Sequence, residues 1–156
     1  MIPFPEHVIS RRTRRGFSLV EVCLAIVVLG LIALVGMPKV NTFMTHLRVK
    51  RATALVAADL EQAFALAGRQ RKPMRINCNC ASQMYTVTDR LGGTTRLTRT
   101  LGADADYKLT TMTFSAAPVD IFPSGVTSSP LTVTIGSGGY TRQITMSSAG
   151  QVRIVP

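Results

Sequence analysis

The sequence predicts an α+β protein, in which one long N-terminal helix packs on a C-terminal antiparallel β-sheet domain. Three features of the 156 residues support this prediction. An unbroken apolar run occupies residues 17–37, apolar residues recur at three- and four-residue steps from about 40 to 67, and the chain from residue 74 onward is rich in Thr, Val, Ile, Gly and Ser. We therefore expect a leader at 1–16, a transmembrane helix at 17–37, an amphipathic helical half at 38–68 and a β-rich domain at 74–156.

The apolar run reads FSLVEVCLAIVVLGLIALVGM, from Phe17 to Met37, and Glu21 is its only charged residue. A helix of this length covers about 30 Å, which is enough to span the hydrocarbon core of a bilayer. The residues before it are basic, so the positive-inside rule places them in the cytoplasm. The β-rich domain would then lie on the opposite side of the membrane.

Two simpler interpretations explain only part of this N-terminus. A secretory signal peptide would have a shorter apolar run followed by a small-residue cleavage site, whereas Pro38, Lys39 and Val40 follow here. A plain membrane anchor explains the length and the basic flank, but it does not explain Glu21. A carboxylate at the centre of a membrane helix costs about 2.5–3.5 kcal/mol on insertion scales, and such residues usually have a functional partner.

The formal net charge is +10, from 18 Lys and Arg against 8 Asp and Glu. The charged residues of the leader are Glu6, Arg11, Arg12, Arg14 and Arg15. Without these four arginines and one glutamate, 14 basic and 7 acidic residues remain, a net charge of +7. A basic balance favours partners such as nucleic acid or anionic membrane surfaces, but it establishes neither.

The pattern changes from uniformly apolar to amphipathic after Pro38 and predicts a helix with one buried face. We expect one helix from about Phe17 to Ala67, kinked or briefly broken near Pro38 because proline removes a backbone hydrogen bond, and ended by Gly68. Asp59 is among the polar residues between the apolar ones, and the basic residues at 48, 50 and 51 form a solvated face. The predicted buried residues are Val40, Phe43, Met44, Leu47, Leu55, Val56, Leu60, Ala63, Phe64 and Ala67.

Helical periodicity disappears from Met74 onward, and short runs bounded by turn residues predict β-strands. Glycine- or serine-rich turns at 92–93, 136–139 and 147–150 predict hairpins between them. The expected strands are Met74–Asn77, Gln83–Asp89, Thr94–Thr100, Lys108–Phe114, Leu131–Ile135, Thr141–Met146 and Val152–Val155.

The segment RRGFSLVEV, from Arg14 to Val22, resembles the cleavage motif of type IV prepilins and type II secretion pseudopilins. The resemblance implies that a prepilin peptidase cuts after Gly16, that Phe17 becomes the N-methylated new N-terminus, and that Glu21 is the acidic residue of the motif. It also matches Pro38 to a helix-kinking proline of this family. The fold implied is pilin-like, and the protein would be a single-pass protein of the inner membrane with a periplasmic C-terminal domain.

The chemistry of Glu21 fits this resemblance. Cleavage would leave a positively charged amine on Phe17, four residues before the carboxylate, and the two groups could neutralise each other in an isolated subunit. In a fibre, the amine of an incoming subunit could pair with Glu21 of its neighbour, where a low dielectric strengthens the attraction. That pairing would fix the axial register, while the apolar helices supply most of the cohesion.

The C-terminal part, IFPSGVTSSPLTVTIGSGGYTRQITMSSAGQVRIV from Ile121 to Val155, resembles the GspH/FimT branch of minor pilins and pseudopilins. This resemblance implies a low-abundance structural subunit that helps to initiate a fibre or joins its tip. The implied partners are the prepilin peptidase and other minor and major pilins or pseudopilins, in the inner membrane and then in the fibre. It does not decide whether the fibre is a type IV pilus or a type II secretion pseudopilus. A role in protein transport would follow only for the pseudopilus.

The residues that commonly carry catalysis or bind metals do not form a recognisable site. The only histidines are His7 and His46, so neither a histidine-dependent nucleophile nor a zinc site is expected, and we predict a non-enzyme without a cofactor. Cys78 and Cys80 are compatible with a tight loop disulfide in the oxidising periplasm, with two free thiols, or with a bridge elsewhere. Cys23 is interpreted as a small apolar residue in the helix.

The alternative function is that of a DNA-binding minor pilin for uptake in natural transformation. Such members of the branch resemble one another in a G-R-x-R element at the last strand. Here the corresponding residues are Gly150, Gln151, Val152 and Arg153, so that a neutral residue replaces one arginine. Arg142 and Arg153 are the candidate phosphate contacts of this alternative, and exposed strand residues that keep the sheet soluble are the simpler interpretation.

Overall fold

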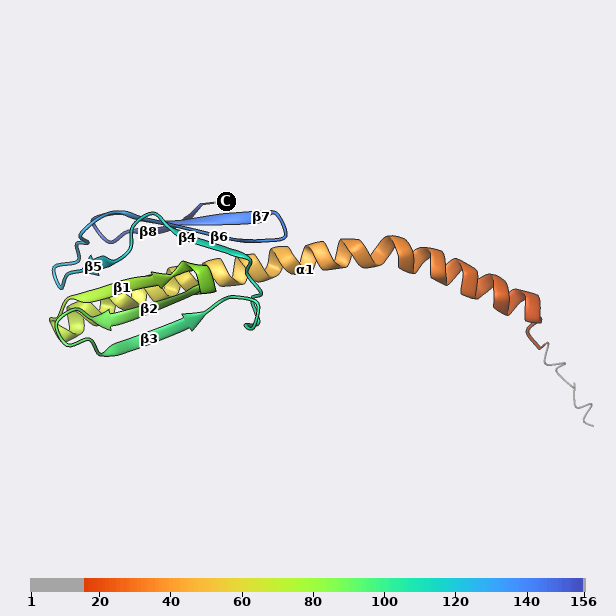
Figure 1. The fold of residues 1–156 in the computed structure, drawn as a ribbon. Coiled ribbons are helices and arrows are strands. Elements are labelled where there is room, and N and C mark those ends of the chain that lie inside the picture. The colour runs from red at the N-terminus through yellow and green to blue at the C-terminus, as the bar shows by residue number, and fades with distance from the viewer. Residues whose placement is uncertain (1–15, 156) are drawn as a thin grey trace, which may run out of the picture. The chain divides into compact units, whose positions relative to one another are not determined.

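The computed structural model of the protein describes residues 16–155 (Figure 1). The predicted leader therefore lies outside the described residues, except for Gly16. The chain divides into two compact units, one ending at Pro38 and one beginning at Lys39. Helix α1, Leu19–Gln70, contributes to both units.

Helix α1 is continuous through residues 36–38, so the expected alternative of a short break at this place was wrong. A kink at Pro38 stays a prediction. The expectation that Gly68 ends the helix was also wrong, because α1 continues to Gln70. The next residue, Arg71, has a φ of 53° and occupies the left-handed conformation that commonly follows the last helical residue. The helix therefore ends at Gln70, before the left-handed Arg71 and without a glycine.

The first unit consists of the N-terminal part of α1 and the residues just before it. Its described side chains are exposed, including those of Leu24, Val28 and Leu31. Within the described residues, α1 is the one helix long and apolar enough to cross a membrane by length and composition, with a mean hydropathy of 2.8 in its most apolar window. An uncovered apolar helix is what lipid or other helices would cover.

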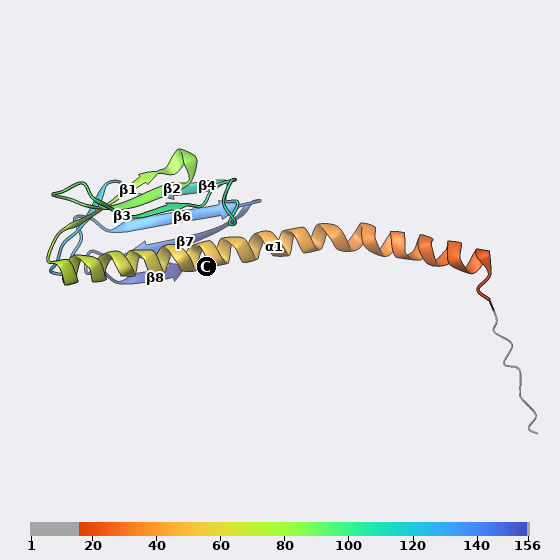
Figure 2. The same ribbon diagram turned by 90° about the horizontal axis from the view of Figure 1, so that it is seen from below.

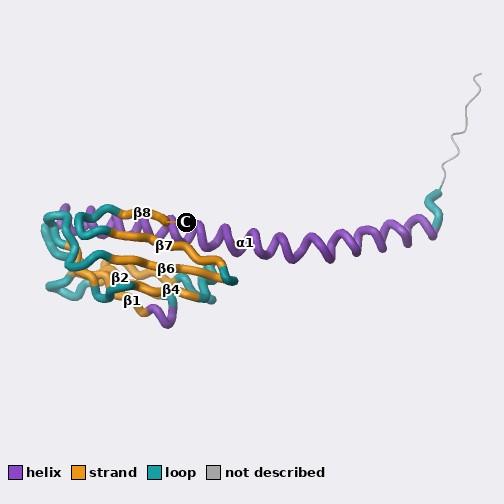
Figure 3. The backbone as a smooth tube through the Cα atoms, turned by 90° about the horizontal axis from the view of Figure 1, so that it is seen from above, coloured by secondary structure: helices purple, strands orange, loops and turns teal. Residues whose placement is uncertain are grey.

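The second unit contains two four-stranded antiparallel sheets, where the sequence indicated one sheet domain. Figure 2 shows the strands along the C-terminal part of α1, and Figure 3 separates the strands from that helix by colour. One sheet has the order β3-β2-β1-β5 and the other the order β4-β6-β7-β8. The strands are β1 Met74–Asn79, β2 Met84–Asp89, β3 Thr95–Thr100, β4 Thr111–Phe114, β5 Val119–Ile121, β6 Leu131–Ser137, β7 Tyr140–Met146 and β8 Val152–Val155.

Each strand expected from the sequence is present, and the three predicted hairpins connect β2 to β3, β6 to β7 and β7 to β8. Strand β5 and the short 3-10 helix Cys80–Ser82 were not expected. The predicted α+β fold, with one long N-terminal helix and antiparallel strands, is confirmed.

The core of the second unit lies between α1 and the inner residues of both sheets. Of the predicted helical face, Val56, Leu60, Ala63 and Ala67 are buried. Val49 and Ala52 are also buried, although the sequence pattern did not single them out. The buried side chains from the strands are Met74, Ile76, Tyr85, Val87, Met112, Val119, Ile121, Leu131, Val133, Ile135, Ile144 and Met146.

The prediction that the buried face begins at Val40 was wrong. Val40, Phe43 and Met44 are 59%, 61% and 48% exposed. The sheets begin to cover α1 only near His46, whose ring stacks on Tyr140 with the ring centroids 4.1 Å apart. The apolar pattern thus continues on α1 before the strands reach it.

Candidate functional site

The hydrogen bonding of α1 begins at Ser18, so Gly16 and Phe17 precede the helix. The carbonyl oxygen of Ser18 accepts bonds from the backbone N–H groups of Glu21 and Val22, at 3.0 and 3.2 Å. The Phe17 side chain is 81% exposed. The peptide bond between Gly16 and Phe17 therefore lies in exposed, non-helical backbone.

Glu21 lies in the first turn of α1, where the positive end of the helix dipole favours a carboxylate. Its side chain borders two surface hollows. One, of about 370 Å³, is lined by Gly16, Phe17, Ser18 and Glu21, and the other, of about 430 Å³, by Phe17, Glu21, Val22, Ala25 and Ile26. The second hollow is mainly apolar and follows the helix surface.

The Ser18-x-x-Glu21 spacing is also that of a capping box, in which the glutamate would bond the backbone N–H of the serine. This arrangement is not formed, since no hydrogen bond or ion pair joins the Glu21 carboxylate to any group within residues 16–155. Capping therefore does not account for this carboxylate. It remains available for a cation that the described chain does not supply.

The cysteines are placed in different parts of the fold. Cys78 and Cys80 form a disulfide at the end of β1, with their Cα atoms 5.2 Å apart, which selects one of the three alternatives that the sequence left open. The chain turns there from β1 into the 3-10 helix. Cys23 is free and exposed on α1 rather than packed within the protein. In the portion that the structure describes, no cluster of His, Cys, Asp or Glu could hold a metal ion.

The two candidate DNA contacts lie on opposite faces of their sheet. Residues directly opposite each other in an antiparallel pair share a face, and successive residues alternate between faces. Arg153 of β8 is opposite Thr145, whereas Arg142 of β7 shares its face with Ile144. The two arginines therefore do not form one surface patch.

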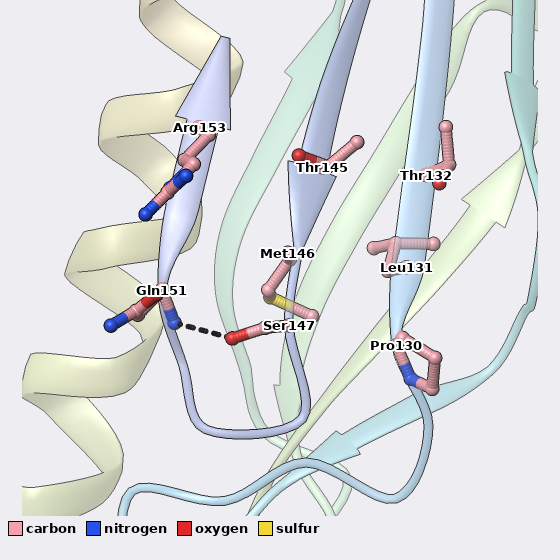
Figure 4. Close-up of a pocket in the computed structure, with 8 residues that line it drawn as sticks. All are labelled: Pro130, Leu131, Thr132, Thr145, Met146, Ser147, Gln151 and Arg153. Carbon is pink, nitrogen blue, oxygen red and sulfur yellow. Dashed lines mark hydrogen bonds between the residues drawn. The ribbon is translucent and has the colours of Figure 1, made fainter. Parts of the chain in front are cut away.

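Arg153 borders a surface hollow of about 420 Å³ beside strands β6, β7 and β8 (Figure 4). The turn between β7 and β8 is closed by Ser147, whose Oγ accepts a hydrogen bond from the backbone N–H of Gln151 at 3.1 Å. The guanidinium of Arg142 instead has its Nε buried without a hydrogen-bond partner in the described chain. Gln151, the neutral residue of the last-strand element, is exposed next to this turn.

A buried polar cluster that was not expected from the sequence joins α1 to β2 and β3. Asp59 was assigned to the polar side of the helix, but it is only 3% exposed. Its carboxylate accepts a hydrogen bond from Tyr85 at 2.6 Å and two from Arg99 at 2.7 and 3.1 Å. Burial, followed by the hydrogen bond to Asp59, raises the pKa of the Tyr85 hydroxyl far above its usual range. The spacing along α1 could have revealed that Asp59 is buried. Asp59 falls on the same helical face as three other buried residues, Ala52, Val56 and Ala63.

Comparison with known proteins gives matches over most of the chain. The family described as type II transport protein GspH matches residues 41–150, and the prokaryotic N-terminal methylation motif matches residues 11–37. A search of curated protein sequences gives no match. The type IV minor pilin FimU of Pseudomonas aeruginosa is 18% identical, with a TM-score of 0.59 over 73% of this chain and 92% of that chain. The minor pseudopilin EpsH of the type 2 secretion system of Vibrio cholerae is 16% identical, with a TM-score of 0.55 over 69% of this chain and 96% of that chain.

Proposed function

This chain belongs to the family described as type II transport protein GspH, and we propose that it is a minor pilin or pseudopilin that helps to initiate a fibre or joins its tip. The family and the structural neighbours are pilins and pseudopilins, which build fibres rather than catalyse reactions. The apolar helix and the methylation motif fit membrane anchoring followed by incorporation into a pilus or pseudopilus. The periplasmic side is the proposed location of the second unit.

The observation that carries this proposal is the carboxylate of Glu21, which has no ion pair or hydrogen bond within residues 16–155 and lies in the first turn of an exposed apolar helix. An ionised group that enters a membrane is unfavourable unless it finds a partner. Within residues 16–155 that partner is missing, so the structure supports a partner created by processing or supplied by another subunit.

Processing would create such a partner close to the carboxylate. Cleavage between Gly16 and Phe17 by the prepilin peptidase leaves an amine, which methylation of Phe17 keeps basic. A rise of 1.5 Å per residue puts this amine about 6 Å along the axis from Glu21 if Phe17 joins the helix. The amine of one subunit and Glu21 of the next would then set the register between neighbouring helices.

The position of the cleavage site supports this step. A peptidase must reach the carbonyl carbon of Gly16, and backbone held in helical hydrogen bonds would obstruct it. Gly16 and Phe17 precede the first helical bond, and Phe17 is exposed. Peptidase, other pilins or pseudopilins and the inner membrane are thus the proposed partners.

The test is made on the full chain expressed in its own cells. Mass spectrometry of the mature protein should find methylated Phe17 as its first residue. Glu21→Val should be cleaved normally but enter fibres at least about tenfold less, because it lacks a charge pair formed at low dielectric. Glu61→Val is the matched control, since Glu61 is an exposed acid of the same helix in the second unit. A mature chain that still begins at Met1 would refute the proposal, and normal incorporation of Glu21→Val would refute the pairing.

Binding of DNA for natural transformation remains an alternative supported by the net charge of +7 after residue 16, from 14 basic and 7 acidic residues. The opposite orientation of Arg142 and Arg153 counts against a single contact surface made by these two residues. A gel-shift titration with duplex DNA at two salt concentrations tests it. Binding that is lost steeply with salt would support this function, and no shift at low salt would remove it.

A further inference from the structure

Two connections meet at the end of the second unit where α1 ends (Figures 1 and 2). The backbone N–H of Arg90 in the β2–β3 hairpin donates to the carbonyl oxygen of Pro73 at 2.9 Å. This bond places the hairpin beside the connection from α1 to β1. We name the exposed side chains here the distal face: Arg69, Arg71, Lys72, Arg90 and Leu91.

Basic residues outnumber acidic residues at this end. The basic residues are Arg69, Arg71, Lys72, Arg75, Arg90 and Arg96, and the acidic residues are Asp89 and Asp120. Six positive charges and two negative charges leave a net charge of +4. A surface with this excess favours a partner of the opposite charge.

Both acids are already bound by arginines of the same chain. Arg96 binds Asp89 at 2.7 Å, while Arg75 and Arg90 bind Asp120 at 2.7 and 3.2 Å. These hydrogen bonds lower the pKa of both carboxyl groups, so they stay ionised and paired. Arg69, Arg71 and Lys72 form no ion pair with any residue of the described chain. Three of the four excess charges therefore lie on these three side chains, and the fourth arises because Arg75 and Arg90 share the carboxylate of Asp120.

The backbone at Arg71 has a conformation that favours glycine. Arg71 has a φ of 53°, a left-handed conformation that costs an L-residue about 1–2 kcal/mol and that glycine adopts freely. The negative end of the helix dipole explains a basic residue in the last turn, such as Arg69. It does not explain why the strained position beyond the helix carries arginine, because glycine would end the helix with less strain.

An exposed apolar residue lies beside these charges. Leu91 at the tip of the hairpin is 83% exposed, more than the other large apolar side chains of the second unit. A hollow of about 310 Å³ is lined by Lys72, Asp89, Leu91, Gly92, Thr94 and Arg96. Binding of nucleic acid through its phosphates requires cations and does not require an exposed leucine. Protein interfaces, in contrast, combine a buried apolar centre with a polar rim.

We propose that the distal face docks on an acidic surface of another protein subunit of the same fibre, with Leu91 inserted into an apolar depression of that subunit. This inference rests on the proposed function, because it names the chemistry of a partner within the fibre. Arg71 and Lys72 pair with carboxylates around the depression, and Leu91 excludes water at its centre. Arg90 is partly held by Asp120 and by the Phe122 ring, 5.7 Å from its guanidinium carbon, so it presents a fixed charge at the rim.

The experiment places the photo-crosslinking residue p-benzoylphenylalanine at position 91 of the full chain in its own cells. Irradiation should give an adduct with another prepilin-type subunit, mapped by mass spectrometry to a segment of net negative charge. Arg71→Glu with Lys72→Glu should reduce the adduct at least about tenfold, which corresponds to a loss of about 1.4 kcal/mol in binding. Lys50→Glu is the charge-reversal control, because Lys50 is an exposed residue of the same helix away from this end. The same probe at Thr113, on an exposed position of β4, should not give this adduct.

A second arm restores the pairing. Replacing the mapped acidic residue of the partner by lysine should recover the adduct with Lys72→Glu. An adduct with nucleic acid, an adduct insensitive to charge reversal, or no adduct from a chain that is cleaved and present in fibres would each overturn the docking surface. Failure of the proposed function is seen separately, as an uncleaved chain or a chain missing from fibres. An adduct with the acidic segment of another subunit in such cells would support binding through the distal face, but it would overturn the placement of that contact within a fibre.

Discussion

The hydroxyl group of Tyr85 on β2 donates a hydrogen bond of 2.6 Å to Oδ2 of Asp59 on α1. Arg99 on β3 binds both oxygens of the same carboxylate, so one buried side chain connects the helix to two strands. A buried carboxylate requires partners of this kind, because an uncompensated charge in the interior is strongly destabilising. The contact therefore fixes the position of the sheet on the helix.

Tyr85→Phe should lower the free energy of unfolding by about 1–3 kcal/mol, since the buried Asp59 loses a donor while the ring remains. Chemical denaturation of the full chain in detergent, followed by circular dichroism, measures this change. The pH dependence gives a second readout. The pKa of Tyr85 is raised in the folded state, so its contribution is complete below its ordinary value of 10.0 and is lost as the pH rises above it. The free energy of unfolding of Tyr85→Phe should therefore fall less above pH 10 than that of the unchanged protein. An equal fall in both proteins would contradict the prediction.

Asp120→Asn should destabilise the second unit at neutral pH and little at acid pH. Hydrogen bonds from Arg75 hold the pKa of Asp120 below its ordinary value of 3.8, against the opposing effect of burial. Stability from this group is therefore present above pH 3.8 and is lost as the pH falls through the lowered pKa. Thermal unfolding at several pH values measures the difference between the two proteins. Asp104→Asn is the control, because Asp104 forms no ion pair with the described residues. If the difference in stability between the two proteins increased towards low pH, the predicted pH dependence would be wrong.

Gly150→Ala should cost about 2–4 kcal/mol of stability. Its φ is 77°, and an added Cβ would lie 2.9 Å from both the carbonyl oxygen of Gly125 and the Phe64 ring. The cost combines left-handed strain with overpacking. Gly139→Ala separates the two, because Gly139 has a φ of 81° but nothing within 4 Å of an added Cβ. The denaturant midpoint of Gly139→Ala should lie between those of the unchanged protein and Gly150→Ala. If the two variants lost the same stability, overpacking would not contribute at Gly150.

Arg71→Gly should be more stable than Arg71→Ala by about 1 kcal/mol. Both variants remove the same charge, but only glycine relieves the left-handed backbone at this position, where φ is 53°. Thermal unfolding of the two variants side by side gives the difference. If both have the same midpoint, the backbone at residue 71 is not strained, and its conformation gives no support to a role of the Arg71 side chain in docking.

The strands and hairpins could be predicted because their signals are local. Runs of Thr, Val and Ile between glycine-rich turns define β6 and β7 without reference to the rest of the chain. Strand β5 was not predicted from the sequence, because it has only three residues, between Pro118 and Phe122. It also depends on pairing with β1, which is far away in sequence. A strand so short has no periodicity to read.

The site was predicted unevenly for the same reason. Gly16, Phe17 and Glu21 belong to one continuous motif, and the structure places them together at the start of α1. Asp59 is bound by residues 26 and 40 positions later, and no local pattern relates them. The disulfide of Cys78 and Cys80 depends on how the chain turns after β1, which the sequence alone left undecided.

The exposed Val40, Phe43 and Met44 have a thermodynamic consequence for the lone subunit. They lie shortly after the predicted transmembrane segment at 17–37, and no other part of the described chain covers these apolar side chains. Burying such a side chain gains about 1.5–3 kcal/mol, and a solitary chain cannot realise this gain. Lateral association with a second helix that covers these side chains is therefore favourable for the isolated subunit.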